Sequence, residues 1–277
     1  MSKIAVIGIA GESVFLSVDS FGVSGETTVA KGFHKELGGK GFNQAIAAAR
    51  YGAEVSFLGA CYQEDTKEFS SVAKSRGVTP FFIGKIERSP YAVITTDKQG
   101  ENKVYVYHGA ELSVEDLNGF AEEIKSADIL LINNETPIEV NERAVEIAKA
   151  NGVKVVLNPA PARKHTQEFL AQIDLFTPNE HETVGLENYQ NIVITLGDKG
   201  CFIKYLGMSI PAQKVKTVVD TTGAGDTFNG VLAACLASGE NIKTACEKAN
   251  IAAAIKVSRK YILDSIPKRE EIETKKR

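Results

Sequence analysis

The chain has 277 residues, of which 43% are apolar and 24% charged, so it can bury a substantial core within one domain spanning residues 1–277. A net charge of −3 provides no basic face for a nucleic acid, because the one cationic cluster is Lys275, Lys276 and Arg277. The four cysteines show no metal-ligand spacing, and no stretch approaches the roughly 20 apolar residues that span a bilayer. We therefore expect a cytoplasmic protein with neither nucleic acid nor membrane as a partner.

Strand-like runs rich in Val, Ile and Phe alternate with segments of helical period from about Lys3 to about Ile255. This alternation is typical of a parallel sheet covered by crossover helices, so the expected fold class is α/β. The first elements expected are a strand at 3–8, a helix at 41–50, a strand at 55–60 and a helix at 65–76. They are followed by a helix at 114–125, a strand at 129–133, a helix at 139–150, a strand at 154–159 and two helices after Gly223.

Two regions interrupt this alternation, at about 12–37 and about 81–108. In the second region the runs FFIGKIE, YAVITTD and KVYVYHG follow one another with turn residues and no helix between them. Short strands in this order predict a small antiparallel sheet inserted into the α/β body. Such an insertion is a common way to form a lid over a ligand cleft.

One segment, VVDTTGAGDTFNGVLAACLASG, runs from a strand into Gly223-Ala224-Gly225-Asp226 and directly on into an apolar helix. Small residues let a ligand approach the backbone, and the free N–H groups of the first helical turn form an anion site at the positive end of the helix dipole. Asp226 stands in the same turn, where it could accept a proton from a hydroxyl held beside a phosphate. The motif alone leaves equally open that this carboxylate only caps the helix.

A second glycine-rich segment, ELGGKGFNQAIAAARYGAEV, opens a helix at Gly38, Gly39 and Gly41. It is not a phosphate-binding Walker A loop, because no Ser or Thr follows Lys40. Lys40 and Asn43 at such a helix start suit the recognition of hydroxyl groups. The alternative is a tight turn with a solvated lysine.

Two linked segments resemble the signatures of the ribokinase-like (PfkB) carbohydrate kinase family: GGKGFNQAIAAARYGAEV and, far along the chain, DTTGAGDTFNG. Supporting matches are NNETP around Glu135, NPAPAR from Asn158, TPNEHE from Thr177 and ITLGDKG from Ile194. The resemblance implies a three-layer α/β/α domain with a mostly parallel sheet and a β-sheet lid through which a homodimer can form. It also implies that ATP, with Mg2+ and with K+ as a possible activator, phosphorylates a hydroxymethyl or other hydroxyl group of a sugar or sugar-like substrate.

The resemblance assigns roles to the residues that match the family's motifs. The catalytic base is Asp226, and the anion hole is formed by Gly223, Ala224 and Gly225. Substrate contacts are assigned to Gly11, Ser13, Gly39, Lys40, Asn43, Glu135 and Asp226. Nucleotide contacts are assigned to Asn179, Thr195, Gly197, Gly200, Gly225 and Asn250, the last near the adenine. Mg2+ is assigned, through water, to Asn179 and Glu182, and a monovalent cation to Asp220, Thr222 and Ser265.

The chain departs from the family pattern after its first strand. Ribokinase-type sequences carry an Asn-x-Asp there whose aspartate holds sugar hydroxyls, but Gly11 and Ser13 occupy these places. The lost carboxylate would accept hydrogen bonds worth roughly 1.5–3 kcal/mol each, which argues against ribose as the substrate. The side chain of Glu12 is expected on the opposite face of the strand.

Two alternative functions remain open at the level of sequence. A nucleoside or aminoimidazole-type substrate would use the same chemistry in a differently shaped pocket. A non-catalytic sugar or nucleotide sensor would explain the lost Asn-x-Asp, although the intact GAGD segment argues against it. K+ activation does not follow from the resemblance, because the loop 261–264 replaces a glycine-containing one.

Overall fold

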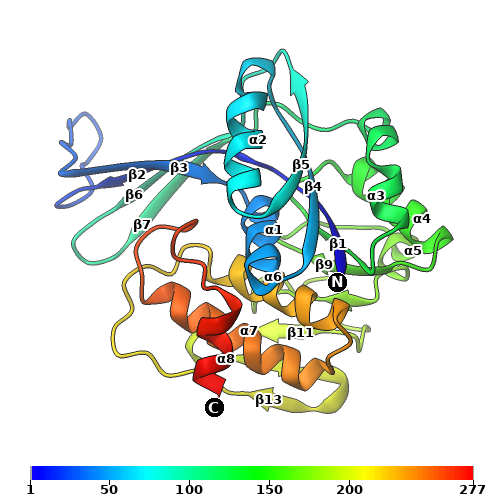
Figure 1. The fold of residues 1–277 in the computed structure, drawn as a ribbon. Coiled ribbons are helices and arrows are strands. Elements are labelled where there is room, and N and C mark those ends of the chain that lie inside the picture. The colour runs from blue at the N-terminus through cyan, green and yellow to red at the C-terminus, as the bar shows by residue number, and fades with distance from the viewer. Residues whose placement is uncertain (1, 277) are drawn as a thin grey trace.

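A six-stranded parallel sheet forms the centre of the computed structural model, which describes residues 2–276 (Figure 1). Its strands lie in the order β10-β9-β8-β1-β4-β5. Their bounds are β1 Lys3–Ile7, β4 Glu54–Tyr62, β5 Val78–Lys85, β8 Ile129–Asn133, β9 Lys154–Asn158 and β10 Leu175–Phe176. The sequence predicted β1, β4, β8 and β9, because parallel strands buried on both faces appear as continuous apolar runs.

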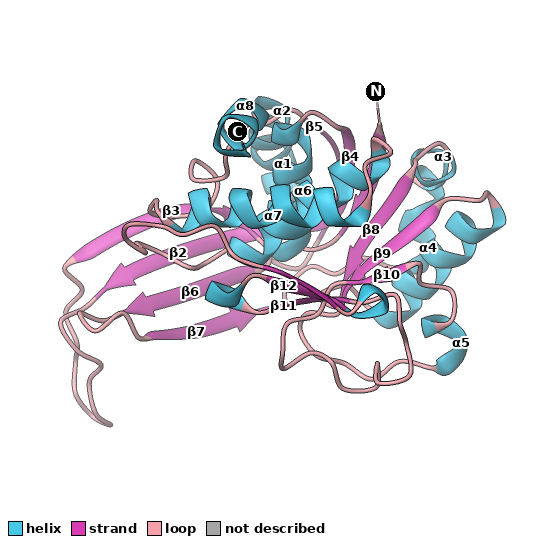
Figure 2. Cartoon of the chain, turned by 90° about the horizontal axis from the view of Figure 1, so that it is seen from below, coloured by secondary structure: helices cyan, strands magenta, loops and turns pink. Residues whose placement is uncertain are grey.

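Helices cover both faces of this sheet, which gives three layers (Figure 2). Side chains alternate along a strand, so Ile4 and Val6 enter one core with α1, α2, α6, α7 and α8, whereas Ala5 and Ile7 enter the other with α3, α4 and α5. The bounds are α1 Lys40–Tyr51, α2 Thr66–Ser75, α3 Ala121–Lys125, α4 Ile138–Ala150, α5 Gln167–Leu170, α6 Ala224–Ala237, α7 Ile242–Val257 and α8 Arg269–Lys276. Within residues 2–276 no helix is long and apolar enough to cross a bilayer.

A separate four-stranded sheet, in the order β3-β2-β6-β7, extends from one side of the body (Figure 1). Its strands are β2 Gly11–Ser17, β3 Gly32–Gly38, β6 Tyr91–Thr96 and β7 Asn102–Tyr107. β2 pairs antiparallel with β3 but parallel with β6, so the sheet is mixed rather than antiparallel as we expected. The sequence shows each strand but not its partners, because the two regions that supply them are far apart along the chain.

The expected boundary of the second lid region was wrong at its beginning. Residues 81–85 do not belong to the small sheet, because they lie in β5 and pair parallel with β4 at the edge of the central sheet. Phe81 packs against one core and Phe82 against the other, so this strand is held by the body of the molecule. A short apolar run without a neighbouring helix was therefore insufficient to assign the strand to a sheet.

A small antiparallel sheet and a turn-rich segment lie between β10 and α6 in the chain. The sheet contains β11 Val193–Thr195, β12 Cys201–Ile203 and β13 Met208–Ile210. Residues 183–191 form turns and no helix, as expected from their short length. The helix expected at 114–125 is divided into a 3-10 helix at Val114–Gly119 and α3.

The small four-stranded sheet exposes a group of large apolar side chains. They are Phe33, Tyr91, Val104, Tyr105, Val106 and Tyr107. The homodimer through this sheet stays a prediction.

A close contact between α1 and α6 brings two distant segments together. Gly230 of α6 allows it, because a Cβ atom at this position would lie 2.3 Å from the backbone oxygen of Gln44 and 2.6 Å from Cβ of Ala47. Neither neighbour can yield easily, since one is backbone and the other is a methyl group in the packed core. The contact fixes the first turn of α1 beside the first turn of α6.

We predict that Gly230→Ala will lower the free energy of unfolding by about 1–3 kcal/mol, because the added methyl group must separate two packed helices. Urea denaturation followed by circular dichroism measures this change. Gly119→Ala is the matched control, since a Cβ atom there meets nothing within 4 Å, and we expect a change within about 0.5 kcal/mol. Equal stabilities of the two variants would contradict the proposed role of the helix contact.

Candidate active site

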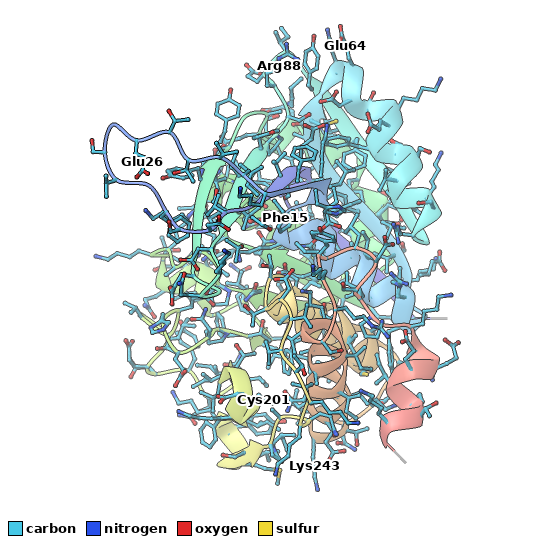
Figure 3. The ribbon with its side chains drawn as sticks, turned by 90° about the vertical axis from the view of Figure 1, so that its left-hand side faces the viewer. Phe15, Glu26, Glu64, Arg88, Cys201 and Lys243 are labelled. Carbon is cyan, nitrogen blue, oxygen red and sulfur yellow. The ribbon has the colours of Figure 1, made fainter. Side chains whose placement is uncertain are left out.

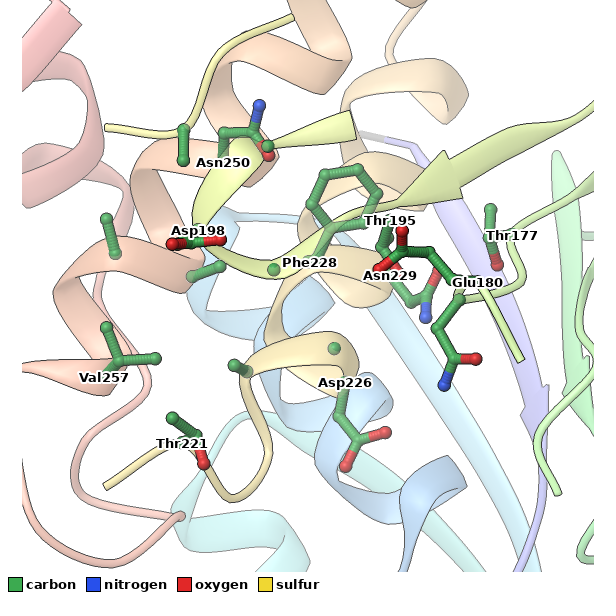
Figure 4. Close-up of a pocket in the computed structure, with 18 of the residues that line it drawn as sticks. Thr177, Glu180, Thr195, Asp198, Thr221, Asp226, Phe228, Asn229, Asn250 and Val257 are labelled. Atoms are coloured by element: carbon green, nitrogen blue, oxygen red, sulfur yellow. The ribbon is translucent and has the colours of Figure 1, made fainter. Parts of the chain in front are cut away.

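A cavity of about 680 Å³ lies near the carboxyl ends of the parallel strands and the beginning of α6 (Figure 4). Asn158, which ends β9, and Thr177, which follows β10, belong to its lining. Figure 4 shows Asp226 at the start of α6, with Asn250 and Thr177 in other parts of the wall. This is the location at which α/β sheets usually bind their ligands.

The turn before α6 leaves backbone donors free at the cavity. Gly223 caps the helix with a φ of 76°, a left-handed conformation that favours glycine. The amide of Ala224 donates to the backbone oxygen of Thr221 at 3.2 Å, and regular helical bonding begins with Thr227 N–H to Gly223 O at 2.9 Å. Of the three predicted anion-hole residues, Gly225 therefore keeps an amide without an acceptor inside the helix, as does Asp226.

Two side-chain amides of α1 hold the Asp226 carboxylate, which is only 8% exposed. Asn43 Nδ2 donates to Oδ2 at 2.9 Å, and Gln44 Nε2 donates to Oδ1 at 3.3 Å. Gln44 also donates to Asn158 Oδ1 at 3.1 Å, which links the carboxylate to the end of β9. Sequence analysis missed Gln44 and gave Asn158 no role; their presence within the matching segments was the one available signal.

A lysine and a second carboxyl lie near Asp226. Lys40 begins α1, and its backbone amide donates to Glu135 Oε2 at 2.8 Å. The Asp226 carboxylate raises the pKa of Lys40, with smaller contributions from Glu135 and Glu182 against the effect of burial. Burial raises the pKa of Glu135 to about 7, although Lys40 opposes this shift. The structure thus brings together Lys40, Asn43, Glu135 and Asp226, as predicted.

The predicted nucleotide residues line the same cavity. The lining contains Asn179, Thr195, Gly197, Gly200, Gly225 and Asn250. The Asn250 amide group donates to the backbone oxygens of Ile210 and Pro211, both at 3.2 Å, and so fixes the loop after β13. Buried Oδ1 of Asn229 has no hydrogen-bond partner, which leaves an acceptor available for a ligand.

The residues assigned to Mg2+ offer oxygen atoms at this cavity. Glu182 and Asn179 both line it, although Glu182 Oε2 accepts the amide of Asn179 at 3.0 Å and Asn179 Oδ1 accepts that of His181 at 2.8 Å. No cluster of three His, Cys, Asp or Glu side chains that could hold a metal occurs within residues 2–276. The carboxylate and amide oxygens of Glu182 and Asn179 fit a hydrated Mg2+ that would be held partly through water.

Several predicted residues lie outside the lining of the cavity. Gly11 packs against Pro90, since a Cβ atom there would lie 2.2 Å from the Pro90 backbone oxygen, and buried Ser13 pairs with Glu36 across β2 and β3. Glu12 forms an ion pair with Lys35 on the other face, as expected. No carboxylate from the start of β2 therefore replaces the one that the Asn-x-Asp would supply.

The residues assigned to a monovalent cation hold other parts of the protein. Asp220 Oδ1 accepts the amide of Thr222 at 2.9 Å, and the Ser265 hydroxyl donates to the backbone oxygen of Lys260. The ammonium of Lys256 contacts Asp220.

Gly39, assigned to the substrate, caps α1 with a φ of 110° and provides no side chain.

Comparisons with known proteins find relatives that match nearly the whole chain. The sequence model described as pfkB family carbohydrate kinase matches residues 1–269. Ribokinase of Haemophilus influenzae is 35% identical over 295 residues that cover 97% of this chain and 96% of its own. The crystal structure of ribokinase from Thermotoga maritima superposes with a TM-score of 0.87 at 31% identity, covering 99% of both chains. A structure of Arabidopsis thaliana ribokinase complexed with ribose and ATP has a TM-score of 0.85 at 25% identity, covering 99% of this chain and 98% of its own.

Fold and sequence together define a phosphotransferase with an alcohol group as acceptor. The chain belongs to the pfkB family of carbohydrate kinases. Its three-layer architecture with a parallel sheet and a small second sheet matches that of the ribokinase structures.

The pKa of Glu135 predicts how stability changes with pH. This pKa is raised from 4.5 to about 7, so the folded protein binds the proton more tightly than the unfolded chain does. The resulting stabilisation is complete below the unfolded value and is lost as the pH rises through the folded value. From about pH 5 to about pH 8, Glu135→Gln should therefore gain about 2–3 kcal/mol in free energy of unfolding relative to wild type.

Urea denaturation of both proteins at the two pH values measures this difference. The same substitution at exposed Glu139 controls for the change in net charge. A constant difference between Glu135→Gln and wild type would show that Glu135 titrates normally.

Proposed function

We propose that this kinase transfers the γ-phosphoryl group of ATP to a hydroxymethyl or other hydroxyl group of a sugar or sugar-like substrate, with Asp226 as the general base. The observation that carries this proposal is the position of the Asp226 carboxylate. It stands in the first turn of α6 beside free backbone donors and lines a cavity of about 680 Å³. A carboxylate that only capped the helix would not need two amide side chains from α1 to orient it.

The proposed step is an in-line displacement at phosphorus. The substrate oxygen forms a bond to the γ-phosphorus, its proton passes to an Asp226 oxygen, and the bond to the leaving ADP breaks. Asn43 and Gln44 each occupy one lone pair of the carboxylate, so further lone pairs remain to accept the proton. The amides of Gly225 and Asp226 and the ammonium of Lys40 would stabilise the charge that develops on the transferred group.

The nucleotide is proposed to occupy the part of the cavity lined by Thr195, Gly197, Gly200 and Asn250. Support comes from the Arabidopsis ribokinase complex with ATP, whose fold this chain shares. Mg2+ would neutralise phosphate charge near Asn179 and Glu182. The small four-stranded sheet is proposed as the lid that excludes water from the reaction.

The identity of the sugar is proposed to depend on residues that lie outside the lining of the 680 Å³ cavity. Relatives named ribokinase support a pentose, whereas Gly11 and Ser13 remove the carboxylate that would hold its hydroxyls. Glu135 and Asn43 remain to bind hydroxyl groups, and Asn43 Oδ1 is buried without a partner. We therefore propose a sugar-like substrate for which ribose is a poor substitute, with a nucleoside as the alternative within the family.

The first test is ADP release from Mg-ATP across pentoses, hexoses, ketoses and nucleosides. One substrate should stimulate the wild type strongly, and Asp226→Asn should lower kcat by about 10²–10⁴-fold, because the amide cannot accept the proton. Nucleotide affinity should change little. Asp128→Asn, an exposed aspartate at the opposite end of the parallel strands, is the control and should retain full turnover.

If Asp226→Asn kept its turnover, another base would operate. Tight binding of a sugar without any ADP release, measured by calorimetry, would instead support the non-catalytic sensor.

A substitution at β2 tests the explanation of specificity. Ser13→Asp restores the missing carboxylate, and we expect it to lower KM for ribose by about tenfold, the equivalent of one charge-assisted hydrogen bond. Ser13→Asn, which adds a similar volume without charge, should leave KM for ribose unchanged. Equal effects of the two substitutions would show that the carboxylate is not what the site lacks.

A further inference from the structure

A fully buried lysine contacts the residue to which the family resemblance assigns a monovalent cation. Lys256 lies in the last turn of α7, and its side chain is 0% exposed. Its ammonium donates a hydrogen bond to the backbone oxygen of Asp220 at 2.8 Å and lies 3.7 Å from Asp220 Oδ2. An ammonium is rarely buried unless it is paired, because the loss of its hydration costs free energy. Asp220 provides the partners here, which indicates a specific role for the charge of Lys256.

Asp220 connects this charge to the turn before α6 and to the C-terminal loop. Its Oδ1 accepts the amide of Thr222 at 2.9 Å, and its Oδ2 accepts that of Tyr261 at 3.0 Å. The amides of Val219 and Asp220 also donate to the backbone oxygen of Val257, at 2.7 and 3.2 Å. The end of α7 is therefore fixed against the segment that leads to the anion-binding turn.

The C-terminal loop in turn packs on the anion-binding turn and on β3. The side chain of Ile262 lies against Gly223, where a Cβ atom would come within 2.9 Å of it. The amides of Ile262 and Leu263 donate to the Glu36 carboxylate at 2.8 and 3.1 Å. Phe15 of β2, labelled in Figure 3, packs against Tyr261 with ring centroids 5.8 Å apart. One cluster thus joins the small sheet, the loop and the start of α6.

The surroundings of Lys256 act on its charge in two opposite directions, and burial is the larger effect. Burial lowers the pKa of Lys256, and the carboxylates of Asp220, Glu36 and Asp226 oppose this change. A K+ ion at this position would lie beside the Asp220 oxygens that the Lys256 ammonium already engages, and the two positive charges would repel each other. The residues present therefore do not fit a K+ ion at this position.

We propose that Lys256 is an internal cation that takes the place of a bound monovalent ion, holds Asp220 and the anion-binding turn in position, and makes this kinase independent of K+. The inference rests on the proposed function, because it concerns the positioning of the same anion site. Lys256 acts through Asp220 and the turn and touches no reacting atom, so it is a positioning residue.

The test measures two quantities in Na+, K+ and tetramethylammonium chloride at equal ionic strength. One is the Kd of N-methylanthraniloyl-ADP with Mg2+, and the other is kcat with the acceptor that releases most ADP. The wild type should give values within about twofold in all three salts. Lys256→Met, which keeps length without charge, should lose about tenfold or more in kcat and bind the nucleotide more weakly in every salt.

Lys256→Ala distinguishes a positioning charge from a merely structural side chain. It should show the same loss in tetramethylammonium chloride, but K+ or NH4+ should restore part of both values, because the shortened side chain leaves space beside Asp220 for a small cation. Lys243→Met is the matched control, since Lys243 is an exposed lysine at the other end of the same helix (Figure 3). It should behave as the wild type does.

Two results would overturn the proposal: stimulation of the wild type by K+ of several fold, or unchanged kcat and Kd in Lys256→Met. If circular dichroism showed that Lys256→Met does not fold, the salt dependence of kcat and Kd in the wild type would test the proposal by itself. A wild type that binds no nucleotide in any salt would overturn the proposed function itself. The failure of the Lys256 proposal and the failure of the proposed function would therefore give different results.

Discussion

The contact between α1 and α6 is the constraint on which the active-site arrangement depends. Both helices begin at a glycine with a positive φ, Gly39 at 110° and Gly223 at 76°. The Asn43 hydrogen bond to Asp226 shows that their first turns are neighbours, so the positive ends of two helix dipoles meet at one place. Gly230 makes the approach possible, and the proposed anion site depends on it.

Burial and interactions with neighbouring groups both influence the charges at the beginning of α1 and α6. The carboxylates of Asp226 and Glu135 both raise the pKa of Lys40, and burial, more than the charge of Asp226, raises the pKa of Glu135. The Asp226 carboxylate is stabilised by two amide donors from α1, each a hydrogen bond to a charged group. In the proposed reaction, a substrate hydroxyl would therefore meet an acceptor at Asp226 that Asn43 and Gln44 orient.

The same principle extends to the outer side of the anion-binding turn. There Lys256 donates to the backbone oxygen of Asp220. The carboxylate of Asp220 accepts the backbone amides of Thr222 and Tyr261, on the two sides of this contact. Glu36 links this cluster to β3, so the small sheet and the start of α6 share one network of hydrogen bonds. A small sheet attached in this way can affect the proposed anion site without touching a ligand.

Local patterns in the sequence determined the α/β class, most of the elements and the two glycine-opened helices, because apolar periodicity and positive-φ glycines act over a few residues. They also marked Lys40, Asn43 and Asp226, and the family resemblance added Glu135; the structure brings these four residues together. Tertiary structure alone decided which sheet contains residues 81–85. It also decided that Gln44 hydrogen-bonds to both Asn158 and Asp226, and that Lys256 hydrogen-bonds to Asp220. Gln44 and Asp226 are 182 positions apart, and no local signal records a hydrogen bond between elements whose relative placement only the packed core fixes.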